Sequence, residues 1–319
     1  MMISLQRLFN RGLFAITALA VAVQGAYPDP GVVTGDTGLH DPSIVKTSSG
    51  QYIIAHTGTN IQLKTSTDRT RWTNAGAVFP NGASWTTPYT GGDTNLWAPD
   101  ISYHNGLYYL YYSASTFGSA KSAIFLATSS TGASGSWTHK GLVIESNDSL
   151  GYNAIDPNLF VDSDGKWWLS FGSFWSGIKL IALNSSTGLR SGTSLVSIAA
   201  RPNNNGALEA PFITKRGNYY YQWVAFDSCC KGASSTYRTM VGRSTSLSGP
   251  YTDKSGTSML SGGGTEVMAS HGSIHGPGHP AVLSDSDADV FVYHYYANSG
   301  ASYLGINLIR WENDWPVIY

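Results

Sequence analysis

The chain has 319 residues, 42% of them hydrophobic and 13% aromatic, which is enough apolar material for a sizeable core. Only 12% are charged and the formal net charge is -1, which excludes the basic surface of a nucleic-acid-binding protein and a polybasic patch for a membrane surface. Abundant Gly, Tyr and Trp with few charges favour an all-β extracellular protein over a helical cytosolic one.

Residues 1–26 have the order of residues found in a secretory signal peptide. Arg7 and Arg11 precede an apolar segment from Leu13 to Val23, and small residues follow it. That segment is far shorter than the roughly 20 residues that cross a bilayer, and no later segment is long and apolar enough to do so. We therefore expect a secreted protein with no membrane partner, cleaved between residues 22 and 26, with a mature domain over residues 27–319.

Two smaller features also suit an extracellular chain. Asn147 and Asn184 lie in Asn-x-Ser sequons and are candidates for N-glycosylation. The only cysteines, Cys229 and Cys230, are adjacent, so no disulfide joins distant parts of the chain. We expect them to be bonded to each other in an oxidising compartment and to give local rigidity; free buried thiols are the alternative.

Five segments consist of a turn followed by an aromatic and β-branched run, which is typical of a strand after a tight turn. They begin at Gly50, Gly106, Gly165, Gly217 and Ala288. The starts are 56, 59, 52 and 71 residues apart, and strand-only repeats of this length are typical of propeller blades. No long segment has helical periodicity. The sequence predicts an all-β fold, a five-bladed β-propeller in a single domain.

A shorter strand precedes each aromatic one, and its opening carries a polar residue close to a proline. The openings are "HDPSIV", "APDISY", "DPNLFV", "EAPFIT" and "HPAVLS", with the polar residues Asp41, Asp100, Asp156, Glu209 and His279. The first strand of every propeller blade lines the central channel. Equivalent positions from five blades should therefore form a ring around a central cleft.

A carboxylate at the start of a strand is usually a turn or capping residue, and we interpret Asp100 in that way. Asp41, Asp156 and Glu209 need another explanation, because like charges brought together cost free energy and raise each other's pKa values. Such clusters are typical of acid–base chemistry. Two carboxyl groups beside aromatic side chains indicate glycoside hydrolysis, in which one acid protonates the leaving oxygen and another activates water.

The motifs resemble those of glycoside hydrolase family 43, in particular its endo-1,5-α-L-arabinanases, which are five-bladed propellers that invert the anomeric centre. Matching stretches run over nearly the whole mature chain and include "LHDPSIV", "LWAPDISY", "YNAIDPNLF", "FGSFWSGI", "EAPFI", "SCCKG" and "HGPGHPAV". The resemblance implies a secreted enzyme, expected to be monomeric, that cleaves internal α-1,5-L-arabinofuranosidic bonds of linear arabinan in pectin side chains. It implies no organic cofactor and no nucleic-acid partner.

The same resemblance implies a role for each acid. Asp41 resembles the general base that takes a proton from water, and Glu209 resembles the general acid. Asp156 resembles the third carboxylate, whose negative charge disfavours ionisation of Glu209 and so raises its pKa. Because an inverting mechanism needs room for water, the carboxyl groups of Asp41 and Glu209 are expected roughly 6.5–9.5 Å apart.

The resemblance also implies that Asp41 and Asp156 contact the sugar, together with nine other residues. These are Trp97, Phe117, Gly118, Asn153, Ala154, Ile155, Ser173, Phe174 and Trp175. Aromatic faces stack on sugar rings, although most aromatic side chains here should pack between blades. We favour contact for Phe117 and Trp175 and leave Trp97 open; Gly118 would let the chain approach the sugar closely.

For His279 the resemblance implies a central calcium or sodium ion with waters completing its shell. A lone histidine is more often a hydrogen-bonding core residue, and hard cations prefer oxygen ligands. We therefore expect weak binding of the cation and a mainly structural or electrostatic role for it.

Two other functions stay open at this point. An exo-acting α-L-arabinofuranosidase or β-xylosidase on the same fold would differ in whether the cleft is open at both ends, which loop shape decides and sequence hardly shows. A sugar-binding propeller without catalysis would need the aromatic residues but not the carboxylates. All three carboxylates are present, which favours an enzyme.

Overall fold

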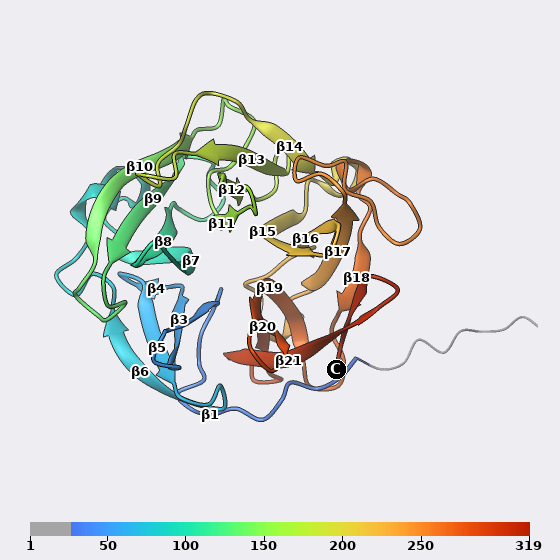
Figure 1. Cartoon of the computed structure of the whole chain (residues 1–319), viewed down its shortest axis with the longest axis horizontal. Coiled ribbons are helices and arrows are strands. Elements are labelled where there is room, and N and C mark those ends of the chain that lie inside the picture. Colours follow the sequence, from blue (N-terminus) through green and yellow to red (C-terminus); the bar gives the residue numbers. More distant parts are fainter. Residues whose placement is uncertain (1–26) are drawn as a thin grey trace, which may run out of the picture.

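The computed structural model describes residues 27–319, so the expected signal peptide at residues 1–26 lies outside the described part of the chain. Five sheets follow one another around a central axis, and each is built from a nearly continuous part of the chain (Figure 1). The predicted five-bladed propeller is confirmed. No helix within residues 27–319 has the length and apolar character needed to cross a membrane.

The first blade's part of the chain contributes one short strand to the second blade. This strand, β4, lies between β3 and β5 in the sequence but pairs with β7 of the second blade. The first sheet comprises β1 (Thr34–Gly35), β6 (Arg71–Ala77), β5 (Gln62–Ser66), β3 (Tyr52–His56) and β2 (Ser43–Lys46). The second comprises β10 (Thr138–Ser146), β9 (Ser122–Ser129), β8 (Leu107–Ala114), β7 (Asn95–His104) and β4 (Gly58–Thr59).

The other three blades each contain four strands in chain order. The third blade comprises β11 (Asn158–Val161), β12 (Trp167–Phe171), β13 (Ile178–Leu183) and β14 (Val196–Ala199). The fourth comprises β15 (Leu208–Arg216), β16 (Tyr219–Phe226), β17 (Arg238–Ser244) and β18 (Thr265–Met268). The fifth comprises β19 (His275–Ser284), β20 (Asp289–Tyr296), β21 (Ser302–Glu312) and β22 (Trp315–Ile318). Helical turns in the described chain are short: α1 (Thr87–Thr90) and the 3-10 turns η1 (Ser84–Thr86), η2 (Pro202–Asn204), η3 (Gly232–Ser234) and η4 (Met259–Ser261).

Each predicted aromatic segment forms the second strand of its blade, namely β3, β8, β12, β16 or β20. Successive side chains of a strand point to opposite faces, and a blade is covered on both faces by its neighbours. In β8, Tyr111 packs with Leu169 and Phe171 of the third blade, whereas Tyr112 packs with Leu63 of the first. Consecutive aromatic residues can therefore both be fully buried, which explains the continuous aromatic runs.

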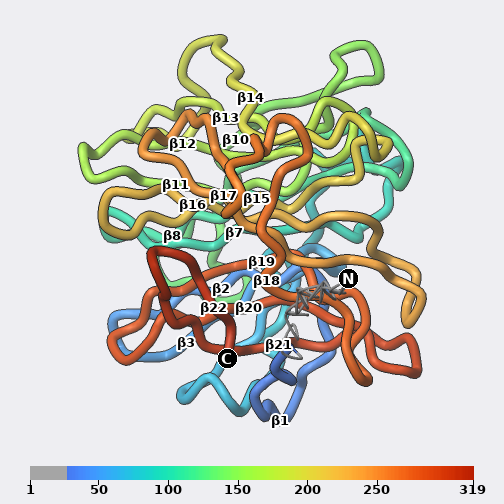
Figure 2. The backbone as a smooth tube through the Cα atoms, turned by 90° about the vertical axis from the view of Figure 1, so that its right-hand side faces the viewer, coloured from blue at the N-terminus to red at the C-terminus, as the bar shows by residue number. Residues whose placement is uncertain are grey.

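The last blade closes the ring against the first, and in Figure 2 the blue N-terminal blade lies beside the red C-terminal one. Trp72 and Ile54 share a hydrophobic cluster with Val290 and Val292. In a second contact, Asp285 at the end of β19 accepts hydrogen bonds from side chains of the first blade. The donors are Lys46 at 2.5 Å, Tyr52 at 2.5 Å and Arg69 at 3.1 Å.

A residue–proline pair lies just before or within every inner strand, and the first residue of each pair has a positive φ. These first residues are Asp41 (φ 49°), Ala98 (45°), Asp156 (57°), Ala210 (53°) and His279 (56°). The left-handed region is uncommon outside glycine, and a following proline restricts a residue further. Its recurrence in all five blades shows that the conformation belongs to the fold.

This recurrence corrects the predicted alignment of the inner strands. The polar residues of the second and fourth openings had been placed on the ring, but Ala98 and Ala210 hold the equivalent positions there. Asp100 follows its ring position by two residues, and Glu209 precedes its own by one. Polarity misaligns these two openings, because the repeated feature is the backbone conformation before proline.

Asp100 instead joins three blades, as expected of a residue that binds backbone and neighbouring groups. Its carboxylate is buried and accepts hydrogen bonds from Leu159 N–H (2.7 Å), Ser43 Oγ (3.2 Å) and Asn158 Nδ2 (3.3 Å). Ser43 and Asn158 occupy the same position after the proline, and each accepts a backbone N–H from the next blade. Burial raises the pKa of Asp100 to about 6, against the effect of these hydrogen bonds.

Candidate active site

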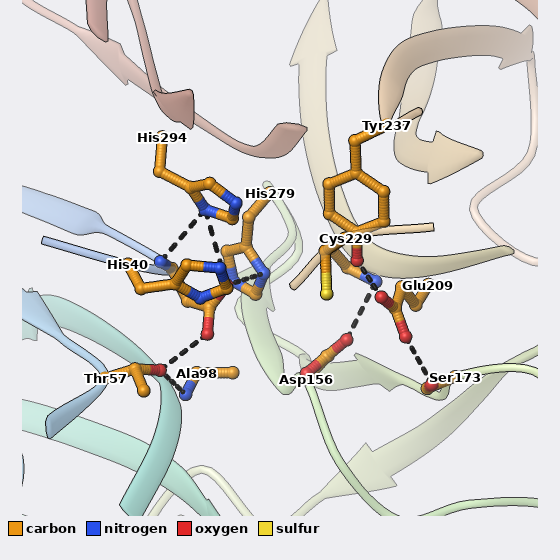
Figure 3. A network of polar contacts seen from close by, with 12 residues as sticks. His40, Thr57, Ala98, Asp156, Ser173, Glu209, Cys229, Tyr237, His279 and His294 are labelled. Carbon is orange, nitrogen blue, oxygen red and sulfur yellow. Dashed lines mark hydrogen bonds and ion pairs between the residues drawn. The ribbon is translucent and has the colours of Figure 1, made fainter. Parts of the chain in front are cut away.

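The site lies where the inner strands begin, and Figure 3 shows Asp156, Glu209 and His279 around one space there. Asp41 completes the group, since its carboxylate contacts both His40 and His279. The Asp41 side chain is 13% exposed, and Asp156 and Glu209 are 7% and 8% exposed. The three carboxyl groups are thus largely withdrawn from solvent but not sealed from it.

Asp41 is held by groups from the first and fifth blades. Its Oδ1 lies 2.8 Å from His40 Nδ1, 3.2 Å from His279 Nδ1 and 3.5 Å from His294 Nδ1. Its Oδ2 accepts a hydrogen bond of 2.6 Å from Thr57 Oγ1, the residue that follows β3. The carboxylate is therefore fixed from both oxygens.

The surroundings of Asp41 keep it ionised. Burial alone would raise its pKa, but the charge and hydrogen bond of His40, with His279 beside it, outweigh burial and hold the pKa of Asp41 well below its usual range. His294 acts here as a neutral group, because its Nδ1 accepts the Asp41 N–H at 3.1 Å and burial lowers its pKa well below the usual value. Burial disfavours the protonated form of His40 as well. The charge and hydrogen bond of Asp41 outweigh burial there, so the pKa of His40 is raised.

Glu209 and Asp156 have the opposite character. Burial raises the pKa of Glu209 to about 7; the charge of Asp41 adds to this, and the hydrogen bond from Ser173 opposes it. Burial raises the pKa of Asp156 well above its usual value, with the charges of Glu209 and Asp41 adding to the effect. Two carboxyl groups that interact this strongly titrate as a pair. The pair retains a proton near neutral pH.

Hydrogen bonds fix both members of this pair. Ser173 Oγ donates to Glu209 Oε2 at 2.5 Å, and the Tyr237 hydroxyl donates to Oε1. Asp156 Oδ2 accepts the N–H of Ala210 at 3.0 Å, so Asp156 is tied to the residue beside Glu209 (Figure 3). One carboxylate that is ionised and one carboxyl pair that keeps a proton are the two components of acid–base hydrolysis.

The sequence comparison decides the family. The model of glycosyl hydrolases family 43 matches residues 30–316. The chain belongs to this family. The extracellular endo-α-(1→5)-L-arabinanase 1 of Bacillus subtilis (strain 168) is 48% identical over 284 residues, which are 87% of this chain and 87% of that protein.

Solved structures of arabinanases agree with the fold. An endo-arabinanase from Bacillus licheniformis has a TM-score of 0.85 at 48% identity and covers 90% of this chain and 99% of its own. An exo-1,5-α-L-arabinanase from a bovine ruminal metagenomic library has a TM-score of 0.83 at 40% identity and covers 88% and 97%. The predicted family resemblance is confirmed. Similarity of fold does not separate endo from exo action.

Some of the sugar contacts expected from the family 43 motifs lie at the surface. Phe117 and Gly118 lie in the loop after β8, where Phe117 is 85% exposed. Trp175, in the loop after β12, is 41% exposed. Trp97 and Phe174 are half-buried. Phe117 and Trp175 therefore have faces free to meet a ligand.

The remaining expected contact residues are buried. Asn153 accepts a hydrogen bond from Ser122 Oγ at 2.6 Å, and Ala154 is fully buried. The Ile155 carbonyl accepts the N–H of Gly172 at 2.9 Å. Ser173, as described above, is bound to Glu209. These residues are withdrawn from solvent and bonded within the protein, in contrast to the exposed aromatic ones.

Sequence reasoning missed several residues that contact Asp41 or Glu209: His40, Thr57, Tyr237 and His294. A repeated signal existed for two of them. In three blades the second, aromatic strand has a polar side chain at or near its end. This side chain accepts a hydrogen bond from the backbone N–H of the residue that precedes an inner-strand proline. The acceptors are Thr57 for Ala98, Ser113 for Asp156 and His294 for Asp41.

Within residues 27–319, few side chains are grouped in a way that could hold the expected cation. Two groups of three possible ligands occur: His40, Asp41 and His294, and His40, Cys229 and Cys230. Neither includes His279. The Nδ1 atom of His279 faces Asp41, which leaves Nε2 as its ligand atom. This donor set fits a hydrated cation with one protein ligand and does not fit a cation enclosed by protein oxygens.

Proposed function

We propose that this chain is a secreted endo-1,5-α-L-arabinanase that hydrolyses internal α-1,5-L-arabinofuranosidic bonds of linear arabinan with inversion. The observation that carries the proposal is the arrangement of three buried carboxyl groups: His40 and His279 hold the pKa of Asp41 well below its usual range, whereas burial raises the pKa values of Asp156 and Glu209. The B. subtilis and B. licheniformis relatives, both described as endo-arabinanases, support arabinan as substrate.

In the proposed first half of the reaction, Asp41 takes a proton from a water molecule while the water oxygen bonds to the anomeric carbon. Thr57 and His40 hold the two oxygens of the carboxylate, so its basic lone pair stays directed at the water. Attack from the face opposite the leaving group inverts the anomeric centre. Asp41 then returns its proton to solvent.

In the other half, Glu209 gives its proton to the glycosidic oxygen as the bond from that oxygen to the anomeric carbon breaks. Ser173 and Tyr237 hold the carboxyl group in place for the transfer. Asp156 keeps the proton on the pair, because a second negative charge in this buried space is unfavourable. The pair regains a proton from solvent before the next turnover.

The substrate is proposed to lie across Phe117 and Trp175, whose exposed rings suit the apolar faces of a neutral furanose polymer. Gly118, Trp97 and Phe174 would border it. The N-terminal 26 residues are proposed to direct secretion, in line with the extracellular B. subtilis relative. Asn147 and Asn184 are both exposed, as glycosylation would require.

A calcium or sodium ion at His279 is proposed as a weakly held part of the site, and when bound it would supply positive charge near the carboxylates. With a single imidazole ligand, we expect calcium to dissociate with a constant on the order of 10⁻⁴ M or weaker. Calorimetric titration of EDTA-treated protein measures this, with His279→Ala as the variant expected to lose the heat of binding. Calcium retained through EDTA treatment and gel filtration would contradict a single-ligand site.

Product analysis on linear arabinan tests the function. Endo action predicts an early mixture of arabino-oligosaccharides and a rapid fall in viscosity. The exo alternative, favoured by the likeness to the ruminal exo-arabinanase, predicts one small product and slow loss of viscosity. Absence of any product on arabinan, with cleavage of an aryl β-xyloside, would point to a xylosidase. Binding of arabinan without any hydrolysis would point to a non-catalytic propeller.

A further inference from the structure

A pair of bonded neighbours, Cys229 and Cys230, lies in the loop between β16 and β17. Figure 3 shows the sulfur of Cys229 among the catalytic side chains, close to Tyr237 and Glu209. The loop comes from the fourth blade and belongs to the same end of the propeller as the acids. Nothing in the proposed chemistry uses the sulfur atoms, so their presence at this place needs another explanation.

A chain of hydrogen bonds leads from this loop to the proposed base. Cys230 N–H donates to the Tyr296 hydroxyl oxygen at 2.9 Å, and that oxygen lies 2.5 Å from His40 Nε2. His40 Nδ1 lies 2.8 Å from Asp41 Oδ1. The chain thus crosses from the fourth blade through the fifth to the first, with Asp41 at its end.

The direction of the first bond is fixed, because a backbone N–H can only donate. The Tyr296 oxygen accepts from Cys230, so its own proton is free to be donated to Nε2 of a neutral His40. If His40 is protonated, Nε2–H donates to the same oxygen. In both states His40 presents an N–H at Nδ1 to Asp41. Tyr296 therefore sets the orientation of the imidazole that holds the base.

The same loop also reaches the proposed acid. Cys229 packs against a small cluster of Ala210, Ala225 and Tyr237. The Tyr237 hydroxyl donates to Glu209 Oε1, and Ala210 N–H donates to Asp156. Cys229 therefore supports Tyr237, which holds Glu209. Cys230 holds Tyr296, the first member of the hydrogen-bond chain that ends at Asp41.

The backbone of Cys230 is in an unfavourable conformation that something must maintain. Its φ is 66°, in the left-handed region that non-glycine residues adopt only when their surroundings impose it. A covalent bond between adjacent side chains restricts the backbone of both residues. The loop is further closed by Lys231 N–H on Ser235 Oγ at 3.0 Å and by Thr236 N–H on the Ser228 carbonyl at 2.9 Å.

We propose that the Cys229–Cys230 bond is a positioning element for both catalytic acids, acting through Tyr296 and His40 on Asp41 and through Tyr237 on Glu209. The inference rests on the proposed function.

Cys230 is exposed and Cys229 half-buried, so a small reductant can reach the bond between them. A water-soluble trialkylphosphine supplies the two electrons: the S–S bond breaks, the phosphine takes the oxygen of one water molecule as phosphine oxide, and the two protons of that water end on the two thiols.

The test compares wild-type protein before and after phosphine treatment, with thiol titration confirming two sulfhydryl groups. Because small misplacements of catalytic groups are costly, we expect kcat on linear arabinan to fall roughly ten- to hundredfold with KM changed less than about twofold. The Cys229→Ala/Cys230→Ala variant should have the same low kcat and should not respond to the phosphine. Full kcat in wild-type protein with both thiols titrated would overturn the proposal.

Tyr296→Phe separates positioning from stability, because it leaves the disulfide intact and removes only the hydroxyl. A loss of kcat at unchanged KM and unchanged melting temperature is expected. Tyr295→Phe is the matched control, since it removes a hydroxyl from the opposite face of β20 and should keep the wild-type kcat. Wild-type kcat in Tyr296→Phe would refute the chain to Asp41. An oxidised wild-type protein inactive on every arabinan would contradict the proposed function instead.

Discussion

Replacement of Asp41 by asparagine is expected to lower kcat on linear arabinan by roughly 10²–10⁴-fold, the usual contribution of a general base. An amide cannot take the proton of the attacking water, although its shape still fits between Thr57 and His40. The loss should be equally severe on an aryl arabinofuranoside, because water activation is needed whatever the leaving group is. KM should change little, since binding of the sugar does not need the base.

Initial rates on both substrates measure this effect, with circular dichroism and thermal unfolding to show that the variant is folded. Asp162→Asn is the matched control: its carboxylate lies beyond the far end of β11 and pairs with Lys215 at 2.8 Å, away from the site. That variant should keep near wild-type activity. A folded Asp41→Asn protein with wild-type kcat would show that another group activates the water.

Replacement of Glu209 by glutamine is expected to show a strong dependence on the leaving group. On arabinan, whose departing sugar oxygen must be protonated, kcat should fall by roughly 10²–10⁴-fold. On a dinitrophenyl arabinofuranoside, whose leaving group departs as a stable anion, the fall should be about tenfold or less. Glutamine retains acceptor and donor groups toward Ser173 and Tyr237, so the surrounding structure should persist.

The ratio of the two losses is the measured quantity, and it cancels any change in the amount of active protein. Asp41→Asn serves as the comparison, because its losses on the two substrates should be similar. Equal losses for Glu209→Gln on arabinan and on the aryl substrate would show that Glu209 does not protonate the leaving oxygen.

Much of the fold was predictable because the propeller imposes a repeated pattern on the sequence. Both faces of each second strand are buried, which produces aromatic runs such as that around Tyr111 and Tyr112 at each repeat. The three carboxyl groups were also predictable, since they recur near the openings of the inner strands. Asp100 was separated from them because a single carboxylate at a strand start has an ordinary structural use.

The arrangement around the carboxyl groups was not predictable from local pattern. In this fold the positive φ before proline occurs at alanine as well as at aspartate and histidine, so Ala98 and Ala210 carry no polar signal. The partners of Asp41 come from distant parts of the chain: His294 is 253 residues away, and the contact of His40 with Tyr296 spans 256. The main cause of the raised pKa of Glu209 is burial, whereas the sequence had pointed to the charge of Asp156.

Asp156 and Glu209 are proposed to act as one buried pair that retains the catalytic proton. The most direct measurement is the pH dependence of kcat/KM for Asp156→Asn on arabinan, beside wild-type protein. Removing the neighbouring charge lowers the pKa at which Glu209 loses its proton, whichever carboxyl group holds it in the wild-type pair. The basic limb should therefore move to lower pH, while burial keeps it above the ordinary range of a glutamate. If the basic limb of the kcat/KM profile of an active Asp156→Asn enzyme stays at the wild-type pH, Asp156 and Glu209 do not act as a pair.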